Sequence, residues 1–172
     1  MNGAQKNTVT GTWPTGHFGW LFRGLSQFEG RAATFLAQGL ERNEQLMFIA
    51  DDPQPRHWPA SLLDSGALQI ASIADVYGSE RIVDAKRQRS AFTTVLAEAL
   101  SQGFSGIRVA ADNTNLIATP ERLIAWSEWE AEGDRFMAEN PVTGMCGFDL
   151  TRADPDNVIK VVGLHAVLVS SN

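Results

Sequence analysis

The sequence predicts an α/β fold, a three-layer α/β/α sandwich in which a mainly parallel β-sheet lies between two layers of helices. Short apolar runs alternate along the chain with segments whose apolar residues recur at helical spacing. The runs are apolar throughout, which is typical of strands buried on both faces of a parallel sheet. Hydrophobic residues make up 44% of the 172 residues and charged residues 20%, so a chain of this length is expected to form one core.

The first strand is expected over residues 18–22 and the second over residues 46–50, because each is a short apolar run. Between them, residues 28–40 carry apolar side chains at helical spacing and should form the first long helix. Three prolines then exclude regular structure from the loop that follows Asp52.

The middle of the chain continues the alternation of helices and strands. A helical turn is expected over residues 61–65 and a third strand over residues 68–74. Asp84 is expected to cap a second long helix, whose apolar residues recur at spacings of three and four until Gly103 ends it. A fourth strand over residues 107–111 follows and leads into an aspartate.

Thr119 and Pro120 mark the start of a third long helix, because threonine caps helices and proline is accommodated at the first helical position. That helix should run to about Asn140. A fifth strand is expected over residues 145–150. Residues 158–169 hold one or two further strands, or a short helix and a strand.

Charge and composition exclude several classes of protein. A net charge of -6 argues against the basic surface that direct binding to nucleic acid requires. No window approaches the roughly 18 apolar residues of a membrane span. The single cysteine, Cys146, cannot form an internal disulfide, which fits a reducing compartment. We therefore expect a cytoplasmic protein with a loose segment over residues 1–15 and one domain over residues 16–172.

Charged residues follow several of the predicted strands. Arg23 follows the first strand, Asp51 the second and Asp112 the fourth, while Asp149 lies in the fifth. Parallel strands end at one edge of their sheet, and ligands of such folds bind there. Repulsion among the carboxylates would be relieved by a cation, by Arg23 or Arg108, or by raised pKa values. The alternative is that the aspartates cap helices or face solvent in loops.

Cys146, Asp149 and His165 are the residue types of a nucleophile, an orienting acid and a base. Cys146 is also interpreted as a sensing thiol or as a small core residue, because a lone cysteine in an apolar strand often only packs. His17, at the edge of the first strand, is either a ligand contact or a histidine satisfied within the core. The three histidines of the chain show no paired spacing of metal ligands, so no metal site is predicted.

Aromatic residues mark two further candidates. Trp126 and Trp129 share one face of the third long helix, and Glu130 lies one turn after Trp126. This group either lines a ligand cavity or packs against the sheet. Trp58 stands between prolines and is interpreted as a lid over the crevice or as a knob that docks a partner, with exposure favouring docking. One basic cluster, which is a solvated face or a contact for an acidic partner, comprises Lys86, Arg87 and Arg89.

Five stretches of the chain point together to one family. They are GHFGWLF with His17, FLAQGLERNEQLMFIADD, RVAAD after FSG, CGFD at residues 146–149, and LHAVLV with His165. In this order and spacing, over about residues 16–168, they resemble the MEDS domain. This is the sensory domain of methanogens and methylotrophs, named for the dichloromethane regulator DcmR.

The MEDS family looks like a RecA/KaiC-type P-loop domain without its ATPase residues. A P-loop reads G-x-x-x-x-G-K-[ST], so that lysine reaches the phosphates and a hydroxyl binds magnesium. Here Gly24 and Gly30 are one residue too far apart, Arg31 replaces the lysine and Ala32 replaces the hydroxyl. The resemblance therefore implies a RecA/KaiC-like core that lacks a functional P-loop, with no catalytic residues and no hydrolysis of nucleotides.

Family members usually occur beside DNA-binding, kinase or anti-sigma-factor-antagonist regions. The resemblance therefore implies a non-enzymatic sensory domain, without a cofactor, that receives a small molecule or a signalling protein. We also consider a homodimer, a nucleotide-binding domain with non-standard phosphate contacts through Arg23 and Arg31, and a protein-interaction scaffold without a ligand. The residues predicted to bind the ligand are His17, Arg23, Asp51, Asp112, Trp126, Glu130, Cys146, Asp149 and His165.

Overall fold

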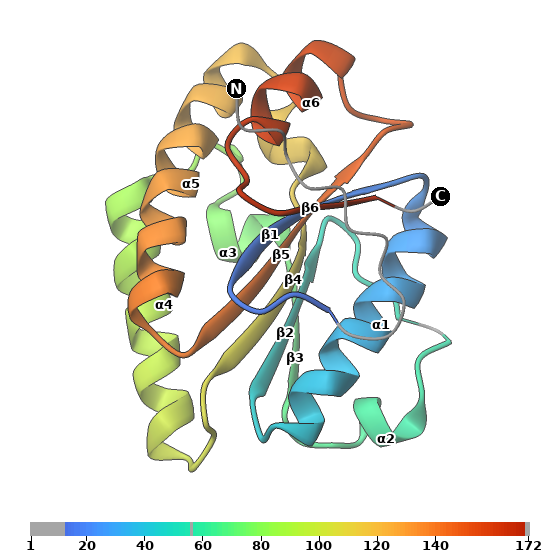
Figure 1. Ribbon diagram of the computed structural model, residues 1–172, viewed down its shortest axis with the longest axis vertical. Helices are drawn as coiled ribbons and strands as arrows, with labels where there is room; N and C mark the ends of the chain where they lie inside the picture. The colour runs from blue at the N-terminus through green and yellow to red at the C-terminus, as the bar shows by residue number, and fades with distance from the viewer. Residues whose placement is uncertain (1–12, 56, 171–172) are drawn as a thin grey trace.

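The computed structural model describes residues 13–55 and 57–170, which form a three-layer α/β/α sandwich (Figure 1). The strands of this part of the chain make one sheet in the order β3-β2-β4-β5-β1-β6, and every neighbouring pair is parallel. The predicted fold class is therefore confirmed. The strands are β1 (His17–Phe22), β2 (Gln45–Ala50), β3 (Leu68–Ser72), β4 (Ile107–Asp112), β5 (Val142–Asp149) and β6 (Leu168–Ser170).

Helices cover both faces of the sheet (Figure 1). Helices α1 (Leu25–Glu41) and α2 (Ala60–Leu63) lie on one face. Helices α3 (Ile73–Tyr77), α4 (Ala85–Ser101) and α5 (Pro120–Glu139) lie on the other. The remaining helical segments are η1 (Thr114–Ile117), a 3-10 turn between β4 and α5, and α6 (Pro155–Val162), which precedes β6.

Strand β2 separates two hydrophobic cores. Leu46, Phe48 and Ala50 belong to the core under α1, whereas Met47 and Ile49 belong to the core under α4 and α5. Successive side chains of a strand point to opposite faces of its sheet. All six residues of β2 are therefore buried, and a strand buried on both faces reads as the continuous apolar run that predicted it.

The predicted helix caps are confirmed. The Asp84 carboxylate accepts a hydrogen bond from the backbone N–H of Arg87 at 3.0 Å, before α4. The Thr119 hydroxyl accepts one from the N–H of Arg122 at 3.3 Å, and Pro120 is the first residue of α5. These side chains satisfy N–H groups that have no partner inside their own helix.

Other boundaries differ from those expected. The third strand ends at Ser72 because the Ser72 hydroxyl and the Asp75 carboxylate form a capping box that begins α3. Residues 158–169 form the end of a helix and a strand, which is the second of the two alternatives. Most of the segment expected to be loose, residues 1–12, lies outside the described residues. Trp13 is only 5% exposed and packs edge-on against Phe35, so it belongs to the core.

Arg108 is buried at the start of β4. Its Nε donates a hydrogen bond to the Glu44 carboxylate at 2.6 Å, and its guanidinium lies 4.7 Å from the centre of the Phe35 ring. The adjacent Gly39 of α1 makes room for it, since a Cβ on Gly39 would lie 2.7 Å from Arg108 Cδ and 2.7 Å from Leu46 Cδ2. Arg108 is therefore a packed residue of the α1 interface.

We predict opposite effects for two glycine replacements in α1. Gly39→Ala should lower the free energy of unfolding by about 1–3 kcal/mol, because the added methyl group overlaps the locked Arg108 side chain. Gly30→Ala should raise it by about 1 kcal/mol, because Gly30 is exposed and its Cβ meets no other atom within 4 Å. Chemical denaturation of both variants checks this. Equal effects of the two replacements would contradict the packing of α1.

Candidate functional site

Asp112 and Asp149 converge at the carboxyl ends of β4 and β5. Arg152 lies between them: its Nε is 2.9 Å from an Asp149 carboxylate oxygen, and its Nη2 forms an ion pair with Asp112. The expectation that Arg23 or Arg108 relieves the repulsion there is wrong. Arg152 supplies the positive charge, and its position three residues after Asp149 was the available sequence signal.

Asp51 follows β2 and has its own partners. Its carboxylate accepts hydrogen bonds from Arg81 at 2.9 and 3.1 Å and from the amide of Asn115. Arg23, by contrast, is exposed, and its backbone N–H donates to the Gln27 side chain. The charged residues predicted at this edge of the sheet therefore do not form one site.

The segment compared with a phosphate-binding loop is helical. Helix α1 begins at Leu25, so that Gly30 and Arg31 lie in its second turn. The backbone N–H of Gly24, at the N-terminus of α1, donates to the Asp149 carboxylate at 3.0 Å. Helix N-termini bind anions through such N–H groups. Here a carboxylate of the same chain already lies in that position.

The environment of Asp149 strongly favours its ionised form. Burial raises the pKa of its carboxyl, but the N–H of Gly24, the Arg152 guanidinium and the groups of Thr151 outweigh burial and bring that pKa to about 2. Asp149 also accepts hydrogen bonds from the Thr151 N–H and hydroxyl at 2.9 and 2.7 Å. The alternative interpretation, in which the strand-end aspartates cap neighbouring segments, therefore describes Asp149.

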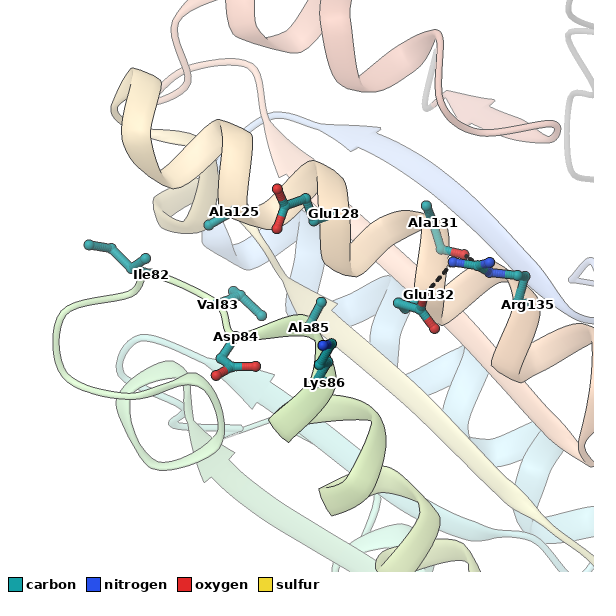
Figure 2. A pocket seen from close by; sticks show the side chains of 10 residues that line it. All are labelled: Ile82, Val83, Asp84, Ala85, Lys86, Ala125, Glu128, Ala131, Glu132 and Arg135. Carbon is teal, nitrogen blue, oxygen red and sulfur yellow. Dashed lines mark hydrogen bonds and ion pairs between the residues drawn. The ribbon is translucent and has the colours of Figure 1, made fainter.

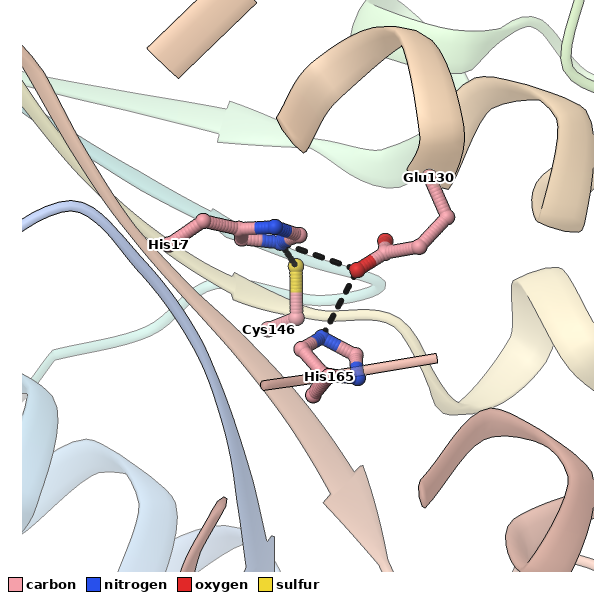
Figure 3. A group of neighbouring side chains, drawn as sticks. All are labelled: His17, Glu130, Cys146 and His165. Carbon is pink, nitrogen blue, oxygen red and sulfur yellow. Dashed lines mark hydrogen bonds and ion pairs between the residues drawn. The ribbon is translucent and has the colours of Figure 1, made fainter. Parts of the chain in front are cut away.

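Four other predicted residues meet on the opposite side of the sheet from α1 (Figure 3). We call His17, Glu130, Cys146 and His165 the buried cluster. One possible ligand atom from each of the four side chains lies within 4.8 Å of the other three. They come from β1, α5, β5 and the connection between α6 and β6, so only the folded chain brings them together.

The pairing of β1 with β5 explains why His17 and Cys146 share a face. Phe18 and Trp20 pack in the core under α1, so His17 and Gly19 point towards α5. Gly19 is paired with Cys146 in the parallel register, and the Cys146 side chain belongs to the core on the α5 side. Glu130 reaches the same place from the buried face of α5.

Gly19 also creates the space that His165 fills. A Cβ on Gly19 would come within 2.9 Å of His165 Cγ. The other sides of the His165 ring are covered by aromatic groups: the Trp126 ring stacks on it with centroids 6.1 Å apart, and the Phe148 ring lies 5.9 Å away. Trp126, which was predicted either to line a ligand cavity or to pack against the sheet, therefore contacts His165 of the cluster.

The cluster centres on one oxygen of Glu130. Glu130 Oε1 lies 2.8 Å from His165 Nε2 and 3.0 Å from His17 Nε2. His17 Nε2 is also 3.3 Å from Cys146 Sγ. The side chains of the two histidines and of Glu130 are no more than 5% exposed.

The outer nitrogen of each histidine contacts a group that accepts hydrogen bonds. His165 Nδ1 lies 3.0 Å from the carbonyl oxygen of Val161, and His17 Nδ1 lies 3.3 Å from the Asp134 carboxylate. A carbonyl or an ionised carboxylate only accepts, so both Nδ1 atoms carry hydrogen. In the neutral rings, both Nε2 lone pairs then face the centre of the cluster. Asp134 was not predicted, although it lies one helical turn after Glu130.

Burial and the Glu130 charge set the protonation of the cluster. Burial lowers the pKa of His165, but Glu130, the Val161 carbonyl and Asp134 outweigh it and raise that pKa above its ordinary value. Burial, reinforced by Glu130, raises the pKa of the Cys146 thiol well above its ordinary value, although a hydrogen bond with Asn113 acts in the opposite direction. Cys146 is therefore a protonated thiol at neutral pH.

The triad considered from Cys146, Asp149 and His165 is not assembled. In the described part of the chain, Asp149 is bonded to Gly24, Thr151 and Arg152, at the strand ends. The nitrogen in contact with the Cys146 thiol belongs to His17.

Two hollows differ in size and in lining. A cavity of only about 20 Å³ adjoins the buried cluster and is bounded by His17, Glu130 and Cys146, by Tyr77 and by mainly apolar neighbours. A surface groove of about 690 Å³ runs between the start of α4 and α5 (Figure 2). Lys86 of the predicted basic cluster lines this groove, together with the ion-paired Glu132 and Arg135. We place the site at the smaller cavity, because its polar groups converge and are buried.

Trp58 is neither an exposed knob nor part of the cluster. It is 7% exposed, and its ring packs edge-on against Phe48 with centroids 4.7 Å apart. The exposure that would favour docking is therefore not found, and Trp58 extends the core under α1.

A family model described as the MEthanogen/methylotroph, DcmR Sensory domain, or MEDS, matches residues 16–166. The chain belongs to the MEDS family. The resemblance seen in the five sequence stretches is thereby confirmed, and the MEDS domain includes all four residues of the buried cluster.

Comparisons outside the family add little to this MEDS assignment. No curated protein matches the sequence. The chain is similar to a solved structure described as "The cytoplasmic domain of EssC", with 14% sequence identity and a TM-score of 0.45. That similarity covers 90% of this chain and 32% of the other, so the MEDS chain spans about a third of the length of that structure. Within residues 13–55 and 57–170, no helix carries an apolar stretch long enough to cross a bilayer.

We predict that Asp149→Asn removes stability in a pH-dependent way. The Asp149 pKa falls from 3.8 in the unfolded chain to about 2 in the MEDS domain, so its carboxylate stabilises the fold above about pH 5. At pH 7 the variant should be less stable by about 2 kcal/mol, and this deficit should shrink as the pH falls towards 2. Denaturant unfolding between pH 7 and the acid limit of folding measures it. The exposed Asp52→Asn serves as the control, and a deficit that does not vary with pH would contradict the prediction.

Proposed function

We propose that this MEDS domain is a non-enzymatic sensory domain of the cytoplasm that binds a small ligand at the buried cluster. It would pass the signal to a transcription regulator, a kinase or an anti-sigma module, without contacting nucleic acid itself. The family's description as a sensory domain supports the general role. The observation that carries the site is the convergence of His17, Glu130, Cys146 and His165 inside the hydrophobic core under α5.

The hydrogen bonding of the cluster is incomplete, which favours a ligand. Among the residues that the structure describes, nothing meets Glu130 Oε1 or His165 Nε2 in hydrogen-bonding geometry. The 2.8 Å between these two atoms is an ion-pair distance without the alignment of a hydrogen bond. Buried polar atoms without hydrogen bonds cost folding free energy, and these two lie only 2.8 Å apart within one cluster.

The strand-end edge supports a role without nucleotide hydrolysis. A nucleotide phosphate would need the N-terminus of α1, where the Gly24 N–H is bonded to Asp149. Arg31 lies within the helix, and Ala32 is buried in the core under α1. The helical conformation of this segment and its residue types support the proposal that it does not bind phosphate.

The position of the buried cluster offers a route for the signal. It joins α5 to strands β1 and β5 and to the connection before β6. The opposite side of α5 lines the surface groove that it shares with the start of α4 (Figure 2). If α5 can take two positions, a ligand that binds Glu130 and His165 more tightly in one position would shift the equilibrium of the protein towards that position.

We predict that the purified domain ignores nucleotides. ATP or GTP with magnesium should leave its melting temperature unchanged and should release no phosphate, because Asp149 occupies the anion position at α1. Differential scanning fluorimetry and a phosphate assay measure both. Saturable nucleotide binding that is lost in Arg31→Ala would favour the nucleotide-binding alternative instead.

A second prediction concerns ligands of the buried cluster. In a panel of metal ions and short-chain alcohols, amines and carboxylates, at least one member should raise the melting temperature of the wild type. Glu130→Gln should abolish that shift, whereas Glu128→Gln, an exposed position on the same helix, should preserve it. A shift that is equal in both variants would contradict the proposed site, and no shift at all would favour a scaffold without a ligand.

A further inference from the structure

We propose that the buried cluster binds a divalent transition-metal ion, with zinc as the best fit. The ion would be held by His17 Nε2, Cys146 Sγ, His165 Nε2 and the Glu130 carboxylate. This inference rests on the proposed function, because it names the class of ligand at the same site.

The donor atoms match this class of ion. Two imidazoles, one thiolate and one carboxylate are all ligands of zinc, which takes four of them in a tetrahedral arrangement. Calcium and magnesium instead prefer sites made of oxygen atoms alone. The presence of the Cys146 sulfur and of two imidazoles therefore selects a transition metal.

The distances are close to those of a bound ion. Zinc–ligand bonds of about 2.0–2.3 Å place neighbouring donor atoms of a tetrahedron about 3.3–3.6 Å apart. In the cluster, His17 Nε2 lies 3.3 Å from Cys146 Sγ and 3.0 Å from Glu130 Oε1, and His165 Nε2 lies 2.8 Å from Glu130 Oε1. The four donor atoms lie within 4.8 Å of one another, so a bound ion would move the closest pairs slightly apart and draw the most distant donors inwards.

The histidines are oriented as metal ligands. Each directs its Nδ1 to an acceptor, the Val161 carbonyl or the Asp134 carboxylate, so in the neutral ring each Nε2 lone pair faces inwards. Metal-bound histidines commonly hold their second nitrogen in this way, which fixes the ring and its tautomer. An ion at the centre would also give Glu130 Oε1 and His165 Nε2 a directional bond, since neither makes a hydrogen bond among the described residues.

Charge balance favours a divalent ion. As the ion binds, the Cys146 thiol releases its proton to solvent, and so does His165 Nε2 in any chain whose His165 is protonated. The thiolate and the Glu130 carboxylate then neutralise two positive charges, and the two imidazoles remain neutral. A buried group of charges is far less costly when its net charge is zero.

The size of the site excludes larger ligands. The adjoining cavity of about 20 Å³ is close to the volume that a single water molecule requires. Organic ligands of ordinary size occupy pockets of about 300 Å³ or more. An ion at the centre of the cluster, with room for one water beside it, fits these dimensions.

Metal titration of the untagged chain tests the inference directly. After removal of metals with a chelator, Zn²⁺ should bind with one ion per chain and raise the melting temperature. Co²⁺ in its place should give the visible bands of a tetrahedral ion and the near-ultraviolet charge-transfer band of a cobalt–thiolate bond. Cys146 is the only cysteine of the chain, so a metal bound elsewhere would not give this band. Cys146→Ser should therefore abolish it.

Matched variants locate the ion. Glu130→Gln should weaken Zn²⁺ binding by about 10–100-fold or more. Glu128→Gln and His57→Gln should leave the affinity unchanged, because both positions are exposed and lie outside the cluster. Circular dichroism of the metal-free variants establishes that each one folds.

A glycine pair tests the geometry without removing a ligand. Gly19→Ala should weaken Zn²⁺ binding about tenfold, because its methyl group would lie 2.9 Å from His165 Cγ and displace that ring. Gly163→Ala, two residues before His165, meets nothing closer than 3.5 Å and should bind Zn²⁺ like the wild type.

The outcomes separate this inference from the proposed function. Absence of Zn²⁺ and Co²⁺ binding, or binding that is unaffected by Cys146→Ser and Glu130→Gln, overturns the metal site. If an organic ligand then gives a thermal shift that depends on Glu130, the sensory function stands without a metal. If no ligand of either kind binds, both proposals fail.

Discussion

The parallel pairing of β1 with β5 is the constraint on which the rest of the structure depends. Its register sets Gly19 opposite Cys146 and sends the side chains of His17 and Cys146 to the α5 side of the sheet. A shift of one residue would move every side chain of a strand to the opposite face. It would place His17 among the aromatic residues under α1 and remove the space that Gly19 provides for His165.

The two faces of this sheet differ in what they bury. The face under α1 is packed by stacked aromatic rings such as Phe22, Phe28 and Phe48, with Trp58 at its margin. The face under α5 is also apolar but encloses the buried cluster. Burying four polar side chains together is unfavourable unless they satisfy one another or share a ligand.

At the carboxyl edge of the sheet, the buried aspartates Asp112 and Asp149 are paired within the chain. Ligands of parallel α/β sheets commonly bind at this edge. Here Asp149 bonds to the N-terminus of α1 and to Arg152, and Arg152 also pairs with Asp112. The candidate site therefore lies beneath α5, on the face of the sheet opposite α1. The apolar surroundings there strengthen electrostatic interactions.

The sequence by itself determined the fold class, the succession of strands and long helices along the chain, and the caps at Asp84 and Thr119. It also placed the four residues of the buried cluster among nine candidate ligand contacts. Those features depend on local spacing, on capping chemistry and on motifs that lie within short stretches. Only the tertiary structure decided that Cys146 contacts His17, that Asp149 bonds to Arg152, and which residues share a site. Such contacts join residues that are distant in sequence, and strand register and helix packing determine them.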